Sequence, residues 1–371
     1  MAINGWASKY RPSQVSELIG QKSVSVTLVQ ASKQNRFGNS YVFSGNKGCG
    51  KTTSARILAN LMTCENVKEG VLCGNCVACT KIGKGFSPDI IEIDAGQDGG
   101  VDEMKKVVDS LSYSPTELKR KVVILDECHL LSKAAISSLL KIVEEPPKYI
   151  CFVFCTTEVN KIPATILSRS QRFNFAKIPS KDVVGRLKIV AEKESISVSE
   201  AALFEIAKLG RGSMRDSLNF FEQIYTAIGG KSFSKTIEET HVQKYFGTAG
   251  RKGIFDIIDA VINNNYAIIL ERVNDLIVAN ANIKDILCEI SEVFRSIMVL
   301  KASNGDPKLL DIPDSEIQQL KNWGEKIKLS QLDSLIRAFA NVNKEIEFSI
   351  NDRWVFESTL LRCASVFVQT A

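Results

Sequence analysis

One short stretch constrains the fold of this chain more than any other. Residues 45–52 read Gly-Asn-Lys-Gly-Cys-Gly-Lys-Thr; an apolar run over 40–43 precedes them, and residues 53–61 follow with the apolar spacing of a buried helix. A strand, a glycine-rich loop and a helix in this order predict a phosphate-binding P-loop. Its glycines let backbone N–H groups turn toward phosphates, and its helix adds a positive dipole end. The alternative is a chance glycine turn before a helix. We expect a nucleoside triphosphate to bind here.

The residue types of this loop assign individual roles. Lys51 would reach the β- and γ-phosphates, and the hydroxyl of Thr52 would ligate Mg²⁺. We expect the loop to be exposed when it holds no nucleotide. The residues expected to bind the nucleotide at this loop are Gly45, Gly48, Cys49, Gly50, Lys51, Thr52 and Thr53.

Two carboxylates follow a second apolar strand. Residues 121–125 read as a buried parallel strand, and Asp126 and Glu127 come directly after it. In a P-loop protein Asp126 would hold Mg²⁺, directly or through water, and Glu127 would polarise the attacking water. The alternative is a strand that ends in an acidic turn. Thr157 follows another buried strand and can sense the γ-phosphate, because ligands collect at the carboxyl ends of parallel strands. His129 is expected to make local hydrogen bonds rather than to be a ligand.

Four of the ten cysteines are clustered. Cys64, Cys73, Cys76 and Cys79 have the spacing C-x8-C-x2-C-x2-C, and Gly-Asn forms a turn between two of them. Such thiolates can converge on one tetrahedral Zn²⁺, which would be structural because four thiolates leave no open position. The alternative is four reduced surface cysteines. We expect this module, residues 64–79, to hang off the core, so that ATP binding survives loss of the metal. Disulfides are not expected.

Composition and pattern predict several domains. A chain of 371 residues is too long for one ordinary core, and 44% hydrophobic with 24% charged residues is typical of a soluble protein. No apolar run is long enough to span a membrane, and the absence of a signal segment favours the cytosol. The net charge of +5 permits an anionic partner without requiring one. We expect a P-loop domain over 1–178, a helical lid over 179–243 and a helical domain over 244–371.

The expected elements follow from periodicity and turn signals. Residues 6–20 are expected to be an extended segment lying along the first domain. The expected strands are 40–43, 89–93, 121–125, 149–155 and 172–175. The expected helices are 21–35, 53–61, 101–111, 133–145, 182–193, 199–209, 213–228, 250–263, 267–279, 283–302, 315–325, 329–345 and 353–368.

These features together resemble the ATPase subunits of bacterial sliding-clamp loaders, the gamma/tau family of DNA polymerase III within the AAA+ superfamily. The resemblance is carried by the Lys-Tyr-Arg-Pro opening at 9–12, the cysteine module, the Asp-Glu-Cys-His run at 126–129, and the segments 140–147, 168–170 and 212–216. One residue departs from the pattern, since Ser170 stands where that family usually has Cys. The resemblance implies an AAA+ α/β domain with a parallel sheet and a zinc module, a helical lid and an all-α collar.

The resemblance also implies further site residues and partners. Ala7, Arg11, Pro12 and Ile19 would flank the adenine and ribose, Arg215 would contact the γ-phosphate from the lid, and Arg169 would act in trans on a neighbour's ATP. The implied cofactors are ATP, Mg²⁺ and structural Zn²⁺. The collar would join related subunits in a pentameric ring. ATP binding would then open a sliding clamp and grip primer–template DNA, and hydrolysis would release the closed clamp on DNA.

Several alternatives remain at this point. The chain could be a loader subunit that does not hydrolyse ATP, a branch-migration motor of the same superfamily, or an ATP-dependent unfoldase. Lys105, Lys106 and Lys133 are candidates for DNA contact, with a merely solvated role as the alternative. The sequence ends where the family's collar ends, so we expect a gamma-type product, a truncated form, or a tail-less homologue from a bacterium or phage.

Overall fold

The computed structural model describes residues 5–81, 87–230, 235–246, 251–278, 281–310, 312, 314–347 and 349–367. The chain forms two compact units: Met1–Lys193 with Ala207–Glu222, and Glu194–Ile206 with Gln223–Ala371. The domain boundaries expected from the sequence stay a prediction.

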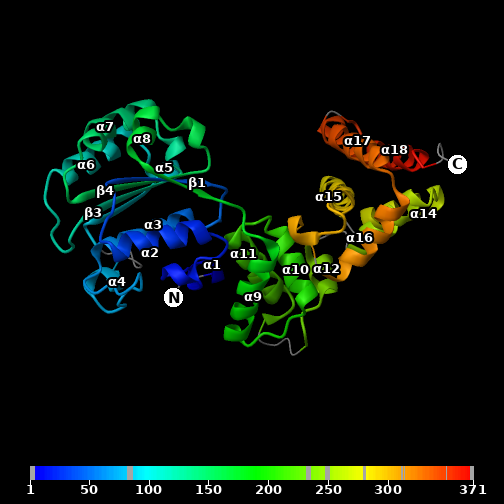
Figure 1. The fold of residues 1–371 in the computed structure, drawn as a ribbon, viewed down its shortest axis with the longest axis horizontal. Coiled ribbons are helices and arrows are strands. Elements are labelled where there is room, and N and C mark those ends of the chain that lie inside the picture. The colour runs from blue at the N-terminus through cyan, green and yellow to red at the C-terminus, as the bar shows by residue number, and fades with distance from the viewer. Residues whose placement is uncertain are drawn as a thin grey trace. The chain divides into compact units, whose positions relative to one another are not determined.

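A five-stranded parallel sheet organises the first unit (Figure 1). Its strands are β1 (Ser40–Gly45), β2 (Ile90–Asp94), β3 (Lys121–Asp126), β4 (Ile150–Thr156) and β5 (Gln171–Phe175), in the order β2-β3-β4-β1-β5. The predicted α/β class is confirmed. Because all strands run the same way, the loops after β1, β3 and β4 meet at one edge of the sheet.

Helices cover both faces of this sheet, as Figure 1 shows. One face carries α2 (Lys22–Lys33) and α3 (Lys51–Thr63), and the other carries α6 (Val101–Leu111), α7 (Lys133–Glu144) and α8 (Ala164–Arg169). Alternate residues of β1 therefore enter different cores: Tyr41 and Phe43 pack on the α3 side, and Val42 on the α7 side. Strands buried on both faces are near-continuous apolar runs, which is why the sequence revealed them.

Short helical elements depart from the sequence expectations. The segment 6–20 is not simply extended, because it contains α1 (Trp6–Lys9) and a 3₁₀ turn, η1 (Val15–Glu17). The short helix α8, which ends at Arg169, was not expected. Two more short helices were not expected, α4 (Val77–Lys81) and α5 (Ala95–Asp98). Such elements span too few turns to show helical periodicity. Two further 3₁₀ turns are η3 (Cys128–Leu130) and η4 (Val159–Lys161).

Everything after β5 in the described residues is helical or connecting loop. The first three of these helices are α9 (Ser180–Glu194), α10 (Glu200–Leu209) and α11 (Met214–Ala227), each within two residues of its expected bounds. The next, α12 (Glu239–Phe246), was not expected.

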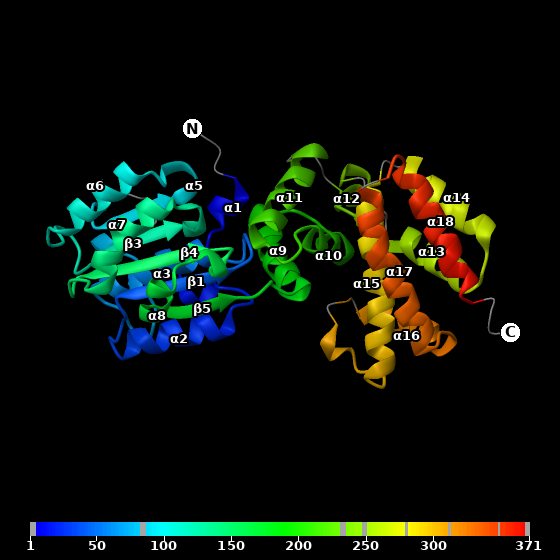
Figure 2. The same cartoon turned by 90° about the horizontal axis from the view of Figure 1, so that it is seen from above.

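Six longer helices build one hydrophobic core in the second unit, and α15 and α17 run side by side in it (Figure 2). They are α13 (Arg251–Ile262), α14 (Tyr266–Val278), α15 (Ile283–Ala302), α16 (Asp314–Lys326), α17 (Leu329–Glu347) and α18 (Asp352–Ser365), with a 3₁₀ turn, η6 (Pro307–Leu309). The expected helix ends at 250, 279 and 368 lie outside the described residues. Among the helices that the structure describes, none combines the length and apolar character needed to cross a membrane.

Candidate nucleotide site and cysteine cluster

An open cleft of about 850 Å³ lies at the carboxyl edge of the sheet. Most of the residues that the sequence analysis assigned to nucleotide binding and hydrolysis line it, whereas Gly45, Thr157 and Arg169 do not. The predicted residues in its lining are Ala7, Arg11, Pro12, Ile19, Gly48, Cys49, Gly50, Lys51, Thr52, Thr53, Asp126, Glu127 and Arg215. The lining residues that the sequence reading missed are Tyr10, Glu17, Leu18, Gln21, Lys47, Ile178, Arg186, Met214 and Leu218.

The backbone of the glycine loop has a shape that only glycine adopts readily. The φ angles of Gly48 and Gly50 are +72° and +105°, and a Cβ on Gly45 would collide with the carbonyl of Phe175. The ammonium of Lys51 is held by the loop itself, with Nζ 3.0 Å from the carbonyl oxygens of Gly45 and Asn46. The expectation of an exposed loop is wrong for Lys51, whose side chain is buried with 4% exposure. The positive charge of Lys51 is therefore held against the loop by these two hydrogen bonds.

The first residues of α3 and the end of β3 bring two oxygen ligands together. The hydroxyl of Thr52 donates a hydrogen bond to Oδ2 of Asp126 at 2.6 Å, and Oδ1 of the same carboxylate accepts the Glu127 amide at 3.1 Å. Hydroxyl and carboxylate oxygens are the donors that Mg²⁺ prefers. These residues fit a magnesium ion shared with a bound triphosphate.

Glu127 is the second carboxylate at this edge, in a left-handed conformation with φ +46°. Its Oε2 accepts a hydrogen bond from the Thr157 hydroxyl at 3.3 Å and lies 3.5 Å from Nδ1 of His129. The same ring nitrogen is 3.2 Å from the Thr156 hydroxyl. Thr157 does not line the cleft, but its hydroxyl contacts Glu127, which does. His129 makes local contacts, as the sequence predicted.

Two segments distant in sequence add positive charge to the cleft. Arg11 and Arg215 both line it, and the amide of Met214 donates to the Gly48 carbonyl at 3.1 Å, which joins the start of α11 to the glycine loop. Burial, followed by the positive charges of Arg56 and Arg215, lowers the pKa of Arg11. A site that crowds guanidinium groups around an amide-lined loop is suited to a polyanion.

Arg169 lies apart from this cleft, at the end of α8. Its Nη1 donates to the Thr165 carbonyl at 3.2 Å, and its Nη2 is 3.7 Å from a carboxylate oxygen of Glu144. The side chain is 43% exposed. It contributes nothing to the lining of its own chain's cleft.

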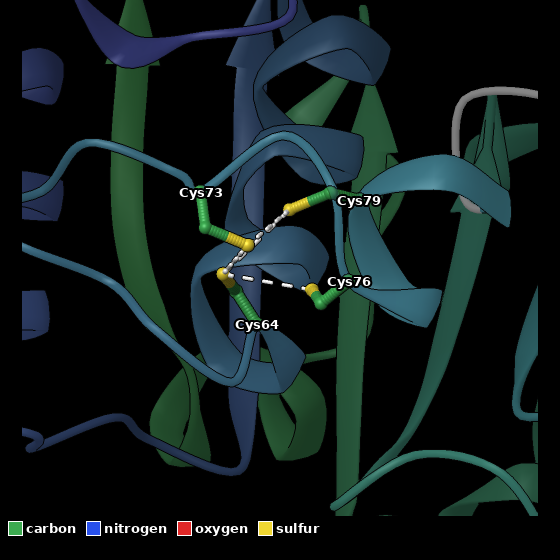
Figure 3. Close-up of side chains that lie close together, drawn as sticks. All are labelled: Cys64, Cys73, Cys76 and Cys79. Carbon is green, nitrogen blue, oxygen red and sulfur yellow. Dashed lines mark hydrogen bonds between the residues drawn. The ribbon is translucent and has the colours of Figure 1, made fainter.

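The four clustered cysteines converge in space (Figure 3). Cys64 caps the end of α3, Cys79 lies in α4, and the sulfur–sulfur contacts of the cluster run from 3.5 Å to 3.9 Å. Four thiolates around Zn²⁺ at about 2.3 Å would have sulfurs about 3.8 Å apart in a tetrahedron. Backbone N–H groups of Asn75 and Cys76 lower the pKa of the Cys73 thiol to about 6. The cluster is therefore compatible with zinc.

Family models of DNA polymerase III subunits match successive parts of the chain. Family models match for the DNA polymerase III delta subunit over residues 20–179, for the ATPase lid domain of DNA polymerase III clamp loader subunits over 182–230, and for domain III of subunits gamma and tau over 237–370. The gamma subunit of Buchnera aphidicola DNA polymerase III is 31% identical over 361 residues, which cover 97% of this chain and 98% of that subunit. This chain belongs to the gamma/tau family of DNA polymerase III.

Other relatives of this gamma/tau family member extend beyond it. The DNA polymerase III tau subunit of Bacillus subtilis is 31% identical over 362 residues, and the match covers 98% of this chain and 63% of that subunit. The chain therefore spans less than two thirds of the tau relative. Among solved structures, the Thermotoga maritima RuvB Holliday junction branch migration motor has a TM-score of 0.50 at 18% identity, covering 74% of this chain and 86% of that one. This likeness shows the AAA+ fold alone.

Proposed function

We propose that this chain is the ATPase subunit of a replicative clamp loader, and that it binds and hydrolyses ATP in the cleft at the edge of the sheet. One observation carries the proposal: Lys51, the Thr52–Asp126 pair and Glu127 meet in a single cleft lined by amides and arginines. Membership of the gamma/tau family supports the clamp as the substrate and the other loader subunits as partners. We place the protein in the cytoplasm as part of the same proposal.

Each side chain has a distinct task in this proposal. Lys51 would bind the β- and γ-phosphates, and Thr52 with Asp126 would hold the Mg²⁺, which supplies positive charge to neutralise them. Glu127 orients the attacking water, and the 3.3 Å hydrogen bond from Thr157 sets the position of that carboxylate. Arg215 contacts the γ-phosphate, and Ala7, Arg11, Pro12 and Ile19 surround the base and ribose.

The proposal is tested by separating nucleotide binding from hydrolysis. Lys51→Ala should abolish hydrolysis and greatly weaken ATP binding. Glu127→Gln should bind ATP and fail to turn it over, because the glutamine keeps the side-chain shape but lacks the carboxylate that orients water. Lys47 lies in the same loop and also lines the cleft, so Lys47→Ala is the matched control: it removes an ammonium group but leaves Lys51 in place. Binding of a fluorescent ATP analogue and release of phosphate would be measured. Full turnover by Lys51→Ala would refute the assignment of the P-loop.

We further propose that Arg169 acts on the ATP of a neighbouring subunit in a ring that also contains related loader subunits. An arginine supplied in trans stabilises transition-state charge and is worth about 10³-fold or more in well-studied GTPases. Arg169→Ala should bind ATP normally and fail to hydrolyse it in the assembled loader. Its mixture with Lys51→Ala subunits should recover activity, because some interfaces then pair an intact P-loop with an intact arginine. A mixture that co-assembles and stays inactive would contradict a role in trans.

A further inference from the structure

The cysteine cluster is joined to the nucleotide cleft by a side-chain amide. Gln14 lies in the N-terminal segment, residues 6–19, whose members line the cleft from Ala7 to Ile19. Its Oε1 accepts a hydrogen bond from the Leu72 amide at 3.0 Å, and its Nε2 donates to the Leu72 carbonyl at 3.4 Å. Leu72 is the residue before Cys73. The side-chain amide of Gln14 therefore pairs with both the N–H and the C=O of Leu72, as the backbone of a neighbouring strand would.

Apolar packing strengthens this junction. Val15, the residue after Gln14, is 3% exposed and belongs to the same hydrophobic cluster as Leu72, Cys64 and Cys76. Partly buried Leu18, which lines the cleft, packs against that cluster as well. The expectation that the module hangs off the core is therefore wrong, because its cysteines and Leu72 are part of the core beneath the N-terminal segment.

The other end of the segment is fixed to helices of the lid. The Trp6 amide donates to a carboxylate oxygen of Glu222 at 2.8 Å, and the Trp6 ring meets Phe221 edge-on at 5.1 Å. Arg186 donates to the Tyr10 carbonyl at 3.0 Å. The segment thus runs from α11 and α9, along the wall of the cleft, to the cysteine cluster. Between these attachments it has only the short elements α1 and η1, so its position depends on what it is attached to.

We propose that Gln14 is a positioning residue through which the metal-loaded cysteine cluster holds the base-side wall of the nucleotide cleft. A metal bound to the four cysteines would restrain the Leu72–Cys73 backbone. The two hydrogen bonds to Leu72 would then restrain Gln14. The cleft-lining residues that follow Gln14 in the segment, Glu17, Leu18 and Ile19, would be held in place as a result. Zinc and nucleotide are then thermodynamically linked, although neither ligand touches the other. This inference rests on the proposed nucleotide site.

Linkage makes the proposal testable in both directions. If zinc favours nucleotide binding, nucleotide must favour zinc retention by the same factor. Two neutral hydrogen bonds lead us to expect a coupling of about five- to thirtyfold. In the wild-type chain, removal of zinc by a chelator under reducing conditions should weaken binding of a fluorescent ADP analogue by that factor. Saturating ADP should slow zinc release, followed with a chromophoric metal indicator.

The variant Gln14→Ala tests whether the coupling between zinc and ADP depends on Gln14. We expect this variant to bind one zinc ion and to bind ADP more weakly, with little further loss of affinity when zinc is removed. Gln34→Ala, in which an exposed glutamine at the end of α2 is truncated, is the matched control and should keep the full coupling. If Gln14→Ala does not fold, Gln14→Glu keeps the side-chain volume and should still reduce the coupling, because it loses the donor to the Leu72 carbonyl.

The outcomes separate this inference from the proposed function. Equal ADP affinity with and without zinc in the wild-type chain would overturn the linkage while leaving the nucleotide site intact. An undiminished zinc effect in Gln14→Ala would show that the coupling bypasses this residue. A wild-type chain that binds no nucleotide at all would instead contradict the proposed function.

Discussion

A buried aspartate offers the sharpest quantitative test of the fold of the first unit. Asp89 precedes β2 with 0% exposure. Its Oδ2 accepts hydrogen bonds from the amides of Thr116, Glu117 and Leu118 at 3.1, 2.7 and 2.8 Å, and Oδ1 accepts the Thr116 amide at 3.0 Å. The turn that it holds also contacts the cysteine region, because Glu117 pairs with Lys81 of α4 at 2.7 Å.

The cost of Asp89→Ala can be worked from these contacts. Hydrogen bonds to a charged group contribute about 1.5–3 kcal/mol each, so three amide donors give a gross loss of about 4.5–9 kcal/mol. Residues 116 and 117 are exposed, and water can replace part of the loss at their amides, so we expect a net cost of about 3 kcal/mol. Asp89→Asn keeps one acceptor oxygen and should cost about 1 kcal/mol.

Scanning calorimetry of the full chain would measure this loss. The transition of the first unit is identified by its rise on adding Mg-ADP, since a ligand stabilises only the unit that binds it. For a unit of this size, about 3 kcal/mol lowers Tm by about 6–12 °C, with Asp89→Asn about a third as far. Asp109→Ala removes an exposed carboxylate from the last turn of α6 and should stay within about 0.5 kcal/mol of the wild-type chain. A Tm for Asp89→Ala within about 1 °C of the wild-type value would refute the reasoning.

Three further predictions concern the metal sites and the cleft wall. Elemental analysis of reduced protein should find one zinc per chain, and Cys73→Ser combined with Cys76→Ser should remove it. Thr52→Val should lower Mg²⁺-dependent ATPase activity by about tenfold or more, because it deletes an oxygen ligand; wild-type activity would contradict that role. Burial favours a raised pKa for Glu17, but hydrogen bonds from the Ser13 and Gln14 amides and the charge of Arg186 outweigh it and lower the pKa below 4.5. Its carboxylate therefore stabilises the segment fully above pH 4.5 and progressively less as the pH falls through the folded-state pKa. Hydrogen-exchange protection of residues 10–19 should fall in the same pH range in the wild-type chain, and it should not do so in Glu17→Gln.

The sequence predicted the sheet and the loop because each leaves a local signal. β3 and β4 are continuous apolar runs, and the P-loop needs glycines at fixed offsets. The missed elements leave no such signal: α8 has six residues, too few to show a period. Residues of the cleft wall such as Glu17 and Arg186 were missed for a different reason. They reach the site through tertiary packing of segments that are far apart in the chain, which neither spacing nor composition records.

The N-terminal segment shows why that distinction matters for function. Its residue pattern predicted only an extended segment, and its expected place beside the adenine and ribose came from the family resemblance. In the structure its position is set by partners at both ends, Glu222 beyond Trp6 and Leu72 beyond Gln14. A segment with so little secondary structure of its own cannot hold the wall of a cleft by itself. The affinity for a nucleotide that binds against this segment therefore depends on how firmly those attachments hold it. In the proposed linkage, the cysteine cluster contributes to the free energy of nucleotide binding even though it lies outside the cleft.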